Sequence, residues 1–277
     1  MKKQAVIVLV QGNTLKKLKE LESDSIDLGI TSPPYNKCNN NGWLVKKVKY
    51  ESHTDNMNED DYQEDQIQVL NELYRVIKPG GSFFYNHKLR WAKGELLHPF
   101  NWLNKTSWTI KQEIIWNRKI TGNVRGWRFW GIDERIYWLY KPIGSNKIGK
   151  ELKSKHALLS SIWEIRPENN NPHPAPFPID IPARIIYSIM DDEDGIVIDP
   201  YSGSGTTLVA AKLLGKKYVG IELSKEYIKM ATQRINKPWD KDIERLEAEK
   251  DLHKVVKTFK QRKAEGMWEK KQSERKI

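Results

Sequence analysis

The sequence predicts an α/β protein in which helices alternate with the strands of a parallel β-sheet. The clearest evidence lies toward the C-terminal end, at residues 195–235. Short apolar runs at residues 196–198 and 218–221 alternate there with helical periodicity at residues 206–214 and 224–235. Alternation of this length is typical of βαβ units, which build parallel sheets.

The rest of the chain supplies further elements of the same kind. Apolar runs bounded by turn residues predict strands at residues 6–10, 26–30, 82–87, 111–118 and 133–141. Helical periodicity predicts helices at residues 14–23, 60–78 and 179–190, and the second is expected to end at a Pro-Gly-Gly stop. The polar residues 37–60 and 141–178 are expected to form loops. Helical pattern returns in the charged residues 237–277, with apolar side chains expected on one side, among them Ile243, Leu246, Leu252, Val255, Val256 and Phe259.

Composition narrows the class of protein. The 277 residues carry a formal net charge of +11, which favours a polyanionic partner such as nucleic acid. The single cysteine, Cys38, excludes an internal disulfide framework and fits a reducing compartment. No apolar run approaches the roughly 20 residues of a membrane helix, so we expect a cytoplasmic protein with no membrane partner.

A stiff turn follows the strand predicted at residues 26–30. It consists of Ser32, Pro33, Pro34 and Tyr35. The two prolines fix their own φ angles, restrict the residue before each, and remove two backbone donors. We call residues 32–35 the elbow, and we expect it to hold Ser32 and Tyr35 at the carboxyl end of a strand.

A glycine-rich turn, Asp199–Thr207, lies between a predicted strand and a predicted helix. No lysine follows its second glycine, so it is not a phosphate-binding P-loop, and Leu208 stands where a dinucleotide fingerprint needs its third glycine. Glu222 follows about 20 residues after the glycines, where a carboxylate can bind the hydroxyls of a ribose. The pattern therefore favours an adenosine without a pyrophosphate and disfavours a dinucleotide-dependent oxidoreductase.

Together, the elbow and the glycine turn resemble two motifs of the amino-methylating DNA methyltransferases that use S-adenosylmethionine. That family has Asp/Asn/Ser-Pro-Pro-Tyr/Phe at its catalytic turn, and its cofactor turn usually has Phe where this chain has Tyr201. The catalytic motif comes first here, as in the circularly permuted beta group. Further stretches that match are "LYRVIKPGG" (73–81), "HPAPFP" (173–178) and Gly12-Asn13, which stands where the group often has Gly-Asp.

The resemblance implies a three-layer, Rossmann-like class I methyltransferase fold, in which helices cover both faces of a seven-stranded, mostly parallel sheet. It implies a catalytic domain, which we expect at residues 1–236. The composition of the chain adds a DNA-facing loop at 37–60, a target-recognition region expected around 119–172 and a basic helical extension at 237–277. The resemblance assigns catalysis to Ser32, Pro33, Pro34 and Tyr35. It assigns the S-adenosylmethionine site to Asn13, Asp199, Tyr201, Gly203, Gly205, Thr206 and Glu222, with no metal.

The chemistry expected of the elbow is the activation of an exocyclic amine. Such an amine is a poor nucleophile because its lone pair is delocalised into the base, and two hydrogen-bond acceptors can counter this. The Ser32 hydroxyl and the Pro33 carbonyl are the expected acceptors, and Tyr35 is expected to stack on a base turned out of the duplex. A serine at the first position favours the N4 amine of cytosine, and the N6 amine of adenine is the alternative.

Double-stranded DNA is thus the expected partner, with a restriction endonuclease as functional partner in a bacterium or archaeon; a homodimer is left open. Basic stretches with aromatic residues at 37–50 and 117–131 are expected to face the DNA. Methyltransferases of protein glutamine or RNA are disfavoured because their glycine turn precedes the catalytic motif. A catalytically silent nucleic-acid-binding module is disfavoured by the intact elbow.

Overall fold

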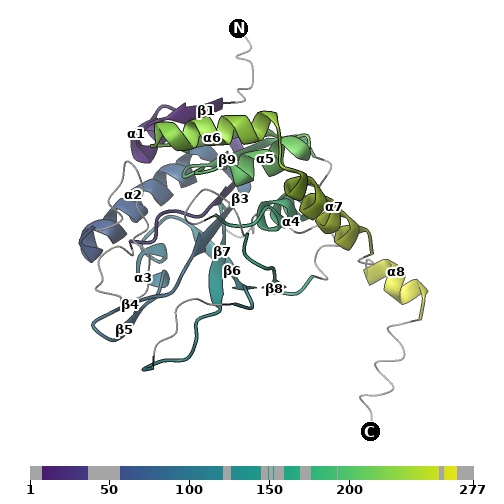
Figure 1. Cartoon of the computed structure of the whole chain (residues 1–277), viewed down its shortest axis with the longest axis horizontal. Helices are drawn as coiled ribbons and strands as arrows, with labels where there is room; N and C mark the ends of the chain where they lie inside the picture. Colours follow the sequence, from purple (N-terminus) through teal and green to yellow (C-terminus); the bar gives the residue numbers. More distant parts are fainter. Residues whose placement is uncertain are drawn as a thin grey trace.

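A computed structural model describes residues 8–36, 57–120, 126–144, 149, 152, 159–168, 176–191, 193–255 and 259–266. Its main strands are β1 (Val8–Gln11), β2 (Ile26–Thr31), β3 (Ile77–His87), β6 (Thr109–Asn117), β7 (Asp133–Tyr140), β8 (Ile162–Glu164), β9 (Ile196–Asp199) and β10 (Lys217–Glu222). They form one sheet in the order β1-β10-β9-β2-β3-β7-β6-β8 (Figure 1). A separate small hairpin consists of β4 (Arg90–Ala92) and β5 (Glu95–Leu97).

The expected α/β class and the mostly parallel sheet are confirmed. All pairings between the first five strands of this order are parallel, and β7 runs antiparallel to both of its neighbours. The expected number of seven strands was wrong for the described residues, because β8 adds an eighth strand that pairs in parallel with β6. With three residues inside a region expected to be loop, β8 is too short to show strand periodicity, and the buried side chain of Trp163 anchors it.

Helices cover both faces of the sheet. They are α1 (Thr14–Lys19), α2 (Glu59–Val76), α3 (Phe100–Leu103), α4 (Asp180–Ile189), α5 (Thr206–Leu213), α6 (Lys225–Asn236), α7 (Asp240–Val255) and α8 (Phe259–Ala264). Side chains of α1, α2 and α3 share one apolar core with Phe83 and Tyr85 of β3. Phe84, which points to the other face of the same strand, packs in a second core with α4 and α5. None of the described helices is long and apolar enough to cross a membrane.

The junction of α2 and β3 differs from the expected helix stop. The helix ends at Val76, and Pro79 and its two following glycines lie inside β3. Pro79 favours an extended Lys78, and Ile77 already pairs with Ile26 of β2, so the chain leaves the helix before the proline.

Helix α7 packs through charged side chains as well as through the expected apolar Leu246, which is buried in the second core. Its buried residues include Asp242 and Glu249, whereas Ile243 is 44 % exposed. Asp242 pairs with Arg234 of α6 at 2.6 Å, and Glu249 pairs with Arg184 of α4 at 2.5 Å. Periodicity of apolar residues cannot reveal such a face, because its partners come from other helices.

Candidate active site

The cavity of the site lies at the carboxyl ends of β1, β2, β9 and β10. Its volume is about 320 Å³, which is in the range of small-molecule sites. β2 and β9 are neighbours in the sheet, but the chain leaves them in opposite directions, toward β3 and toward β10. This is the topological switch point of an open α/β sheet, where ligands usually bind. A hydrogen bond of 2.7 Å from the Thr31 hydroxyl to Asp199 joins the two strand ends.

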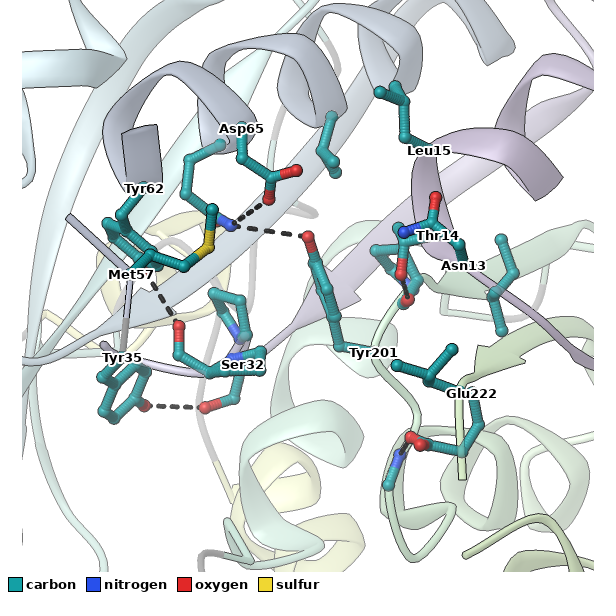
Figure 2. A pocket seen from close by; sticks show the side chains of 18 of the residues that line it. Asn13, Thr14, Leu15, Ser32, Tyr35, Met57, Tyr62, Asp65, Tyr201 and Glu222 are labelled. Atoms are coloured by element: carbon teal, nitrogen blue, oxygen red, sulfur yellow. Dashed lines mark hydrogen bonds between the residues drawn. The ribbon is translucent and has the colours of Figure 1, made fainter. Parts of the chain in front are cut away.

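All four residues of the elbow line the cavity, on the side opposite Glu222 (Figure 2). The Tyr62 hydroxyl of α2 donates to the Pro34 carbonyl at 2.9 Å. Asn36, in a left-handed conformation with φ 52°, bonds through its side-chain amide to both backbone groups of Met57. These contacts fix the far end of the elbow, so that Ser32 and Tyr35 are held in place at the cavity wall.

The glycine turn forms the opposite wall. Gly203 lines the cavity, and its backbone N–H donates to the Glu222 carboxylate at 2.8 Å. The other oxygen of Glu222 accepts from the backbone of Ser224 at 2.8 Å. Burial raises the pKa of Glu222, and hydrogen bonds from the backbone of Ser224, Gly203 and Leu223 oppose that shift. Each oxygen of a carboxylate can accept more than one bond, so acceptor capacity remains at the cavity.

The expected cofactor residues fall into two groups in space. The first group lines the cavity and consists of Asn13, Tyr201, Gly203 and Glu222. The second group lies beneath the cavity and consists of Asp199, Gly205 and Thr206. Only the first group is therefore placed to contact a ligand directly.

The residues beneath the cavity shape the glycine turn. Gly205 caps α5 with φ 81°, and a Cβ atom there would lie 2.9 Å from the Cβ of Ala231. The Thr206 hydroxyl accepts from Arg234 at 2.9 Å. Any effect of these residues on a ligand is transmitted through the residues that line the cavity.

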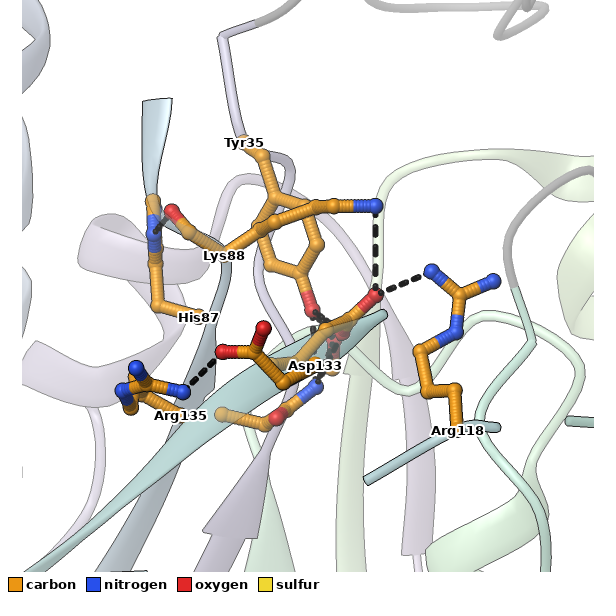
Figure 3. A network of polar contacts seen from close by, with 9 residues as sticks. Tyr35, His87, Lys88, Arg118, Asp133 and Arg135 are labelled. Atoms are coloured by element: carbon orange, nitrogen blue, oxygen red, sulfur yellow. Dashed lines mark hydrogen bonds and ion pairs between the residues drawn. The ribbon is translucent and has the colours of Figure 1, made fainter. Parts of the chain in front are cut away.

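Behind the elbow lies a polar network that reaches into the sheet. The Tyr35 hydroxyl lies 2.7 Å from the Ser32 hydroxyl and donates to Glu134 of β7 at 3.0 Å. The side-chain amide nitrogen of Asn86 on β3 lies 2.7 Å from the Tyr35 hydroxyl, 3.1 Å from Glu134 and 3.2 Å from Ser32, and its two N–H groups are shared among these three acceptors. Arg118 donates to the other oxygen of Glu134 at 3.2 Å (Figure 3). A buried carboxylate is thus linked to the serine of the elbow through the Tyr35 hydroxyl and through the Asn86 amide.

Comparison with known proteins places this site in a family. The family model described as "DNA methylase", for N6 and N4 methyltransferases, matches residues 26–233. The chain belongs to this DNA methylase family. The match includes the elbow, the glycine turn and Glu222, which the structure brings together around one cavity.

Individual relatives are similar over most of their length. The methylase is 32 % identical to the type II methyltransferase M.HpaI of Haemophilus parainfluenzae, over 82 % of this chain and 74 % of that protein. It is 27 % identical to the DNA adenine methyltransferase YhdJ of Escherichia coli strain K12, over 82 % of each chain.

Solved structures share the fold at lower identity. The cytosine-N4-specific PvuII DNA methyltransferase superimposes with a TM-score of 0.67 and 18 % identity, covering 89 % of this chain and 92 % of that one. A DNA modification methylase of Thermus thermophilus, solved in complex with S-adenosyl-L-methionine, gives a TM-score of 0.59 and 24 % identity, over 83 % and 93 %. These likenesses confirm the class I methyltransferase fold.

Several residues of the methylase site escaped the motifs. Tyr62, Asp65 and Gln66 line the cavity from α2, and their spacing on one side of an otherwise apolar helix face was a usable signal. Asn86 follows the apolar part of β3 at its carboxyl end, where site residues often lie. Glu134 comes from the amino end of β7, and nothing nearby in the sequence connects it with the elbow.

Two regions with expected roles lie wholly or partly outside the described residues. Most of the loop expected to face DNA (37–56), with Cys38, lies outside the described residues, as do residues 173–175 of "HPAPFP". Within the described part of the chain, no group of three or more His, Cys, Asp or Glu side chains is arranged to hold a metal ion.

Proposed function

We propose that this methylase transfers a methyl group from S-adenosylmethionine to the N4 amine of a cytosine turned out of double-stranded DNA. The observation that carries the proposal is the shared cavity, which has the Ser32 elbow on one wall and Gly203 with Glu222 on the other. One wall suits a base amine and the other suits a nucleoside, so the reacting groups would meet between them.

Residues at the cavity wall fit the proposed cofactor. The Glu222 carboxylate is fixed by two backbone N–H groups and keeps acceptor capacity for the two hydroxyls of a ribose. Gly203 carries no side chain, so a ligand can approach the backbone closely. Asn13 and Tyr201 complete this wall. The cofactor would supply an electrophilic methyl group, and the cofactor-bound methylase of Thermus thermophilus supports its identity.

The elbow would prepare the amine. Ser32 and the Pro33 carbonyl would accept its two N–H groups, which favours a pyramidal nitrogen with a localised lone pair. With the cofactor held at Gly203 and Glu222, the nitrogen would form a bond to its methyl carbon while the bond from that carbon to sulfur would break. The product nitrogen carries one proton too many, and it loses that proton to an acceptor. Neither a metal nor a covalent intermediate is needed for this step.

An exposed aromatic surface fits the expected contact with DNA. Trp127, Phe129 and Trp130 expose 59 %, 99 % and 65 % of their area. Arg128 lies with its guanidinium 3.9 Å from the centre of the Trp91 ring. Aromatic rings stack on unpaired bases and arginine binds phosphates or base edges, so this surface suits a duplex that has been opened.

The choice of cytosine rests on Ser32, whose hydroxyl is neutral and can both accept and donate. The alternative is the N6 amine of adenine, supported by the similarity to an adenine methyltransferase. Similarity to a type II methyltransferase supports a restriction endonuclease as functional partner.

A direct test is to incubate the full chain with labelled S-adenosylmethionine and bacterial genomic DNA of mixed sequence. The DNA is then digested to nucleosides, and the labelled nucleoside is identified by mass spectrometry. We expect N4-methylcytosine. N6-methyladenine would establish the alternative, and label found only in protein or RNA would reject a DNA substrate.

A further inference from the structure

Glu134 is a buried carboxylate to which the reaction above assigns no task. It is 7 % exposed, at the start of β7, and it contacts three other segments of the chain. Tyr35 and Asn86 donate to one of its oxygens, while Arg118 donates to the other at 3.2 Å. The Lys88 ammonium lies 3.9 Å away (Figure 3). A charge buried at this depth is costly unless it is paired, and here its partners lead to the elbow.

Ser32, Tyr35 and Glu134 form a chain of two hydrogen bonds, and the donor in each bond can be assigned. An ionised carboxylate only accepts, so the single proton of the Tyr35 hydroxyl points to Glu134. The Tyr35 oxygen therefore accepts in its contact of 2.7 Å with Ser32, and Ser32 is the donor. With its own proton directed at Tyr35, Ser32 presents a lone pair, and not a proton, to the cavity.

We propose that Glu134 is a positioning residue that sets the direction of this chain and so makes Ser32 an acceptor for the target amine. The inference rests on the proposed function, since it presumes that Ser32 receives an N–H group of the base. A neutral hydroxyl can rotate and offer either its proton or its lone pairs. The buried carboxylate removes that choice before the substrate arrives, which is preorganisation of the acceptor.

The same hydrogen bonds from Ser32 through Tyr35 to Glu134 can carry the surplus proton away from the methylated nitrogen. The methylated nitrogen gives its extra proton to Ser32 as Ser32 passes its own to Tyr35. The Tyr35 proton then passes to the Glu134 carboxylate, which becomes a carboxylic acid. Each hydroxyl gains one proton and loses one, so the only net changes are a neutral methylated amine and a protonated Glu134.

The substitution Glu134→Gln tests the direction of the chain. An amide has one acceptor and one donor end, and Arg118 requires the acceptor. The amide N–H₂ group would then face Tyr35, whose proton would turn to Ser32, and Ser32 would offer its proton to the cavity. We expect the single-turnover rate of methyl transfer to fall about tenfold or more, with the affinities for cofactor and DNA changed less than about twofold.

A double-mutant cycle separates this role from a structural one. Tyr35→Phe removes the hydroxyl that relays the direction from Glu134 to Ser32. Asn86 still bridges the two residues, but it only donates to both. Glu134→Gln made in the Tyr35→Phe background should therefore change the rate by less than about threefold. Glu113→Gln is the matched control, because Glu113 lies on the neighbouring strand β6 and pairs with Arg135, away from the elbow. It should leave the rate unchanged.

Two outcomes would overturn the inference. One is an equal rate loss from Glu134→Gln in both backgrounds, which would mean that it acts through folding or through another path. The other is an unchanged rate for Glu134→Gln while Ser32→Ala is strongly impaired. A full rate for Ser32→Ala would instead contradict the proposed role of Ser32, so the two failures are distinguishable.

Discussion

The two walls of the cavity are built in different ways. On one wall, Gly203 and Glu222 come from one continuous segment, and their key contacts are backbone N–H groups that bind a carboxylate. The wall with the elbow depends on side chains from three strands, and its Tyr35–Glu134 bond joins residues 99 positions apart. The first wall offers a rigid shape, and the second offers hydroxyl groups whose protons must be directed. We therefore expect substitutions to separate binding from rate.

The largest effect is expected at the elbow. Ser32→Ala removes the acceptor proposed for the target amine, which matters most when the nitrogen becomes positive in the transition state. The single-turnover rate should fall about 100- to 1,000-fold, or about 2.7–4 kcal/mol, while calorimetry finds the affinity for S-adenosylmethionine nearly unchanged. Ser107→Ala, at an exposed serine elsewhere, should retain the full rate. A Ser32→Ala protein with the full rate would mean that the two walls do not differ in this way.

The free energy of unfolding is expected to depend on pH through Asp199, which joins the ends of β2 and β9 by accepting from Thr31. Burial raises the pKa of Asp199 to about 6, although hydrogen bonds from Thr31 and from the Tyr201 backbone oppose the shift. The unfolded chain has the ordinary value near 3.9. A raised pKa stabilises the folded protein at pH values below the unfolded pKa, and this contribution is lost as the pH rises through about 6.

Asp199→Asn should therefore gain stability relative to the wild type as the pH rises. The acceptor for Thr31 and Tyr201 is kept, but the buried charge is removed. The pH-dependent gain in the free energy of unfolding should approach about 3 kcal/mol at pH 8 and about half of that at pH 5. Urea denaturation across this range measures it, and Asp194→Asn at an exposed aspartate is the control. A difference that does not vary with pH would show that Asp199 titrates normally.

Local patterns in the sequence were sufficient to predict the parallel sheet and to locate the elbow and the glycine turn. The strands around the glycine turn and the helix after it follow one another without interruption, so periodicity and glycine spacing were sufficient. The same methods missed β8, with three residues, and the charged buried face of α7. In both cases the stabilising partners lie far away in the sequence, on β6 for the strand and on α4 and α6 for the helix.

The site likewise combines residues that local sequence patterns predict with residues that come from distant parts of the chain. Glu222, which lines the cavity, could be proposed from the sequence because a carboxylate at a typical distance after a glycine turn is a candidate for ribose binding. Glu134 could not be found, because β7 runs antiparallel and its amino end therefore reaches the edge of the sheet where the parallel strands finish. The sequence also offered no role for the Tyr35 hydroxyl, since its partners Asn86 and Glu134 meet it only in the folded chain.

The smallest effect is expected at the opposite wall, and it should appear in binding. Glu222→Ala removes the acceptor proposed for the ribose and leaves the N–H groups of Gly203 and Ser224 without their carboxylate. Cofactor affinity measured by calorimetry should fall by about 1.5–3 kcal/mol, the usual worth of hydrogen bonds to a charged group. At saturating cofactor the single-turnover rate should stay within a few-fold of wild type, because Glu222 does not contact the amine. Glu226→Ala, at an exposed glutamate in the first turn of α6, controls for lost charge and should bind normally. If Glu222→Ala lowers the saturated rate as much as Ser32→Ala does, the two walls act as one unit and the contrast between binding and rate is wrong.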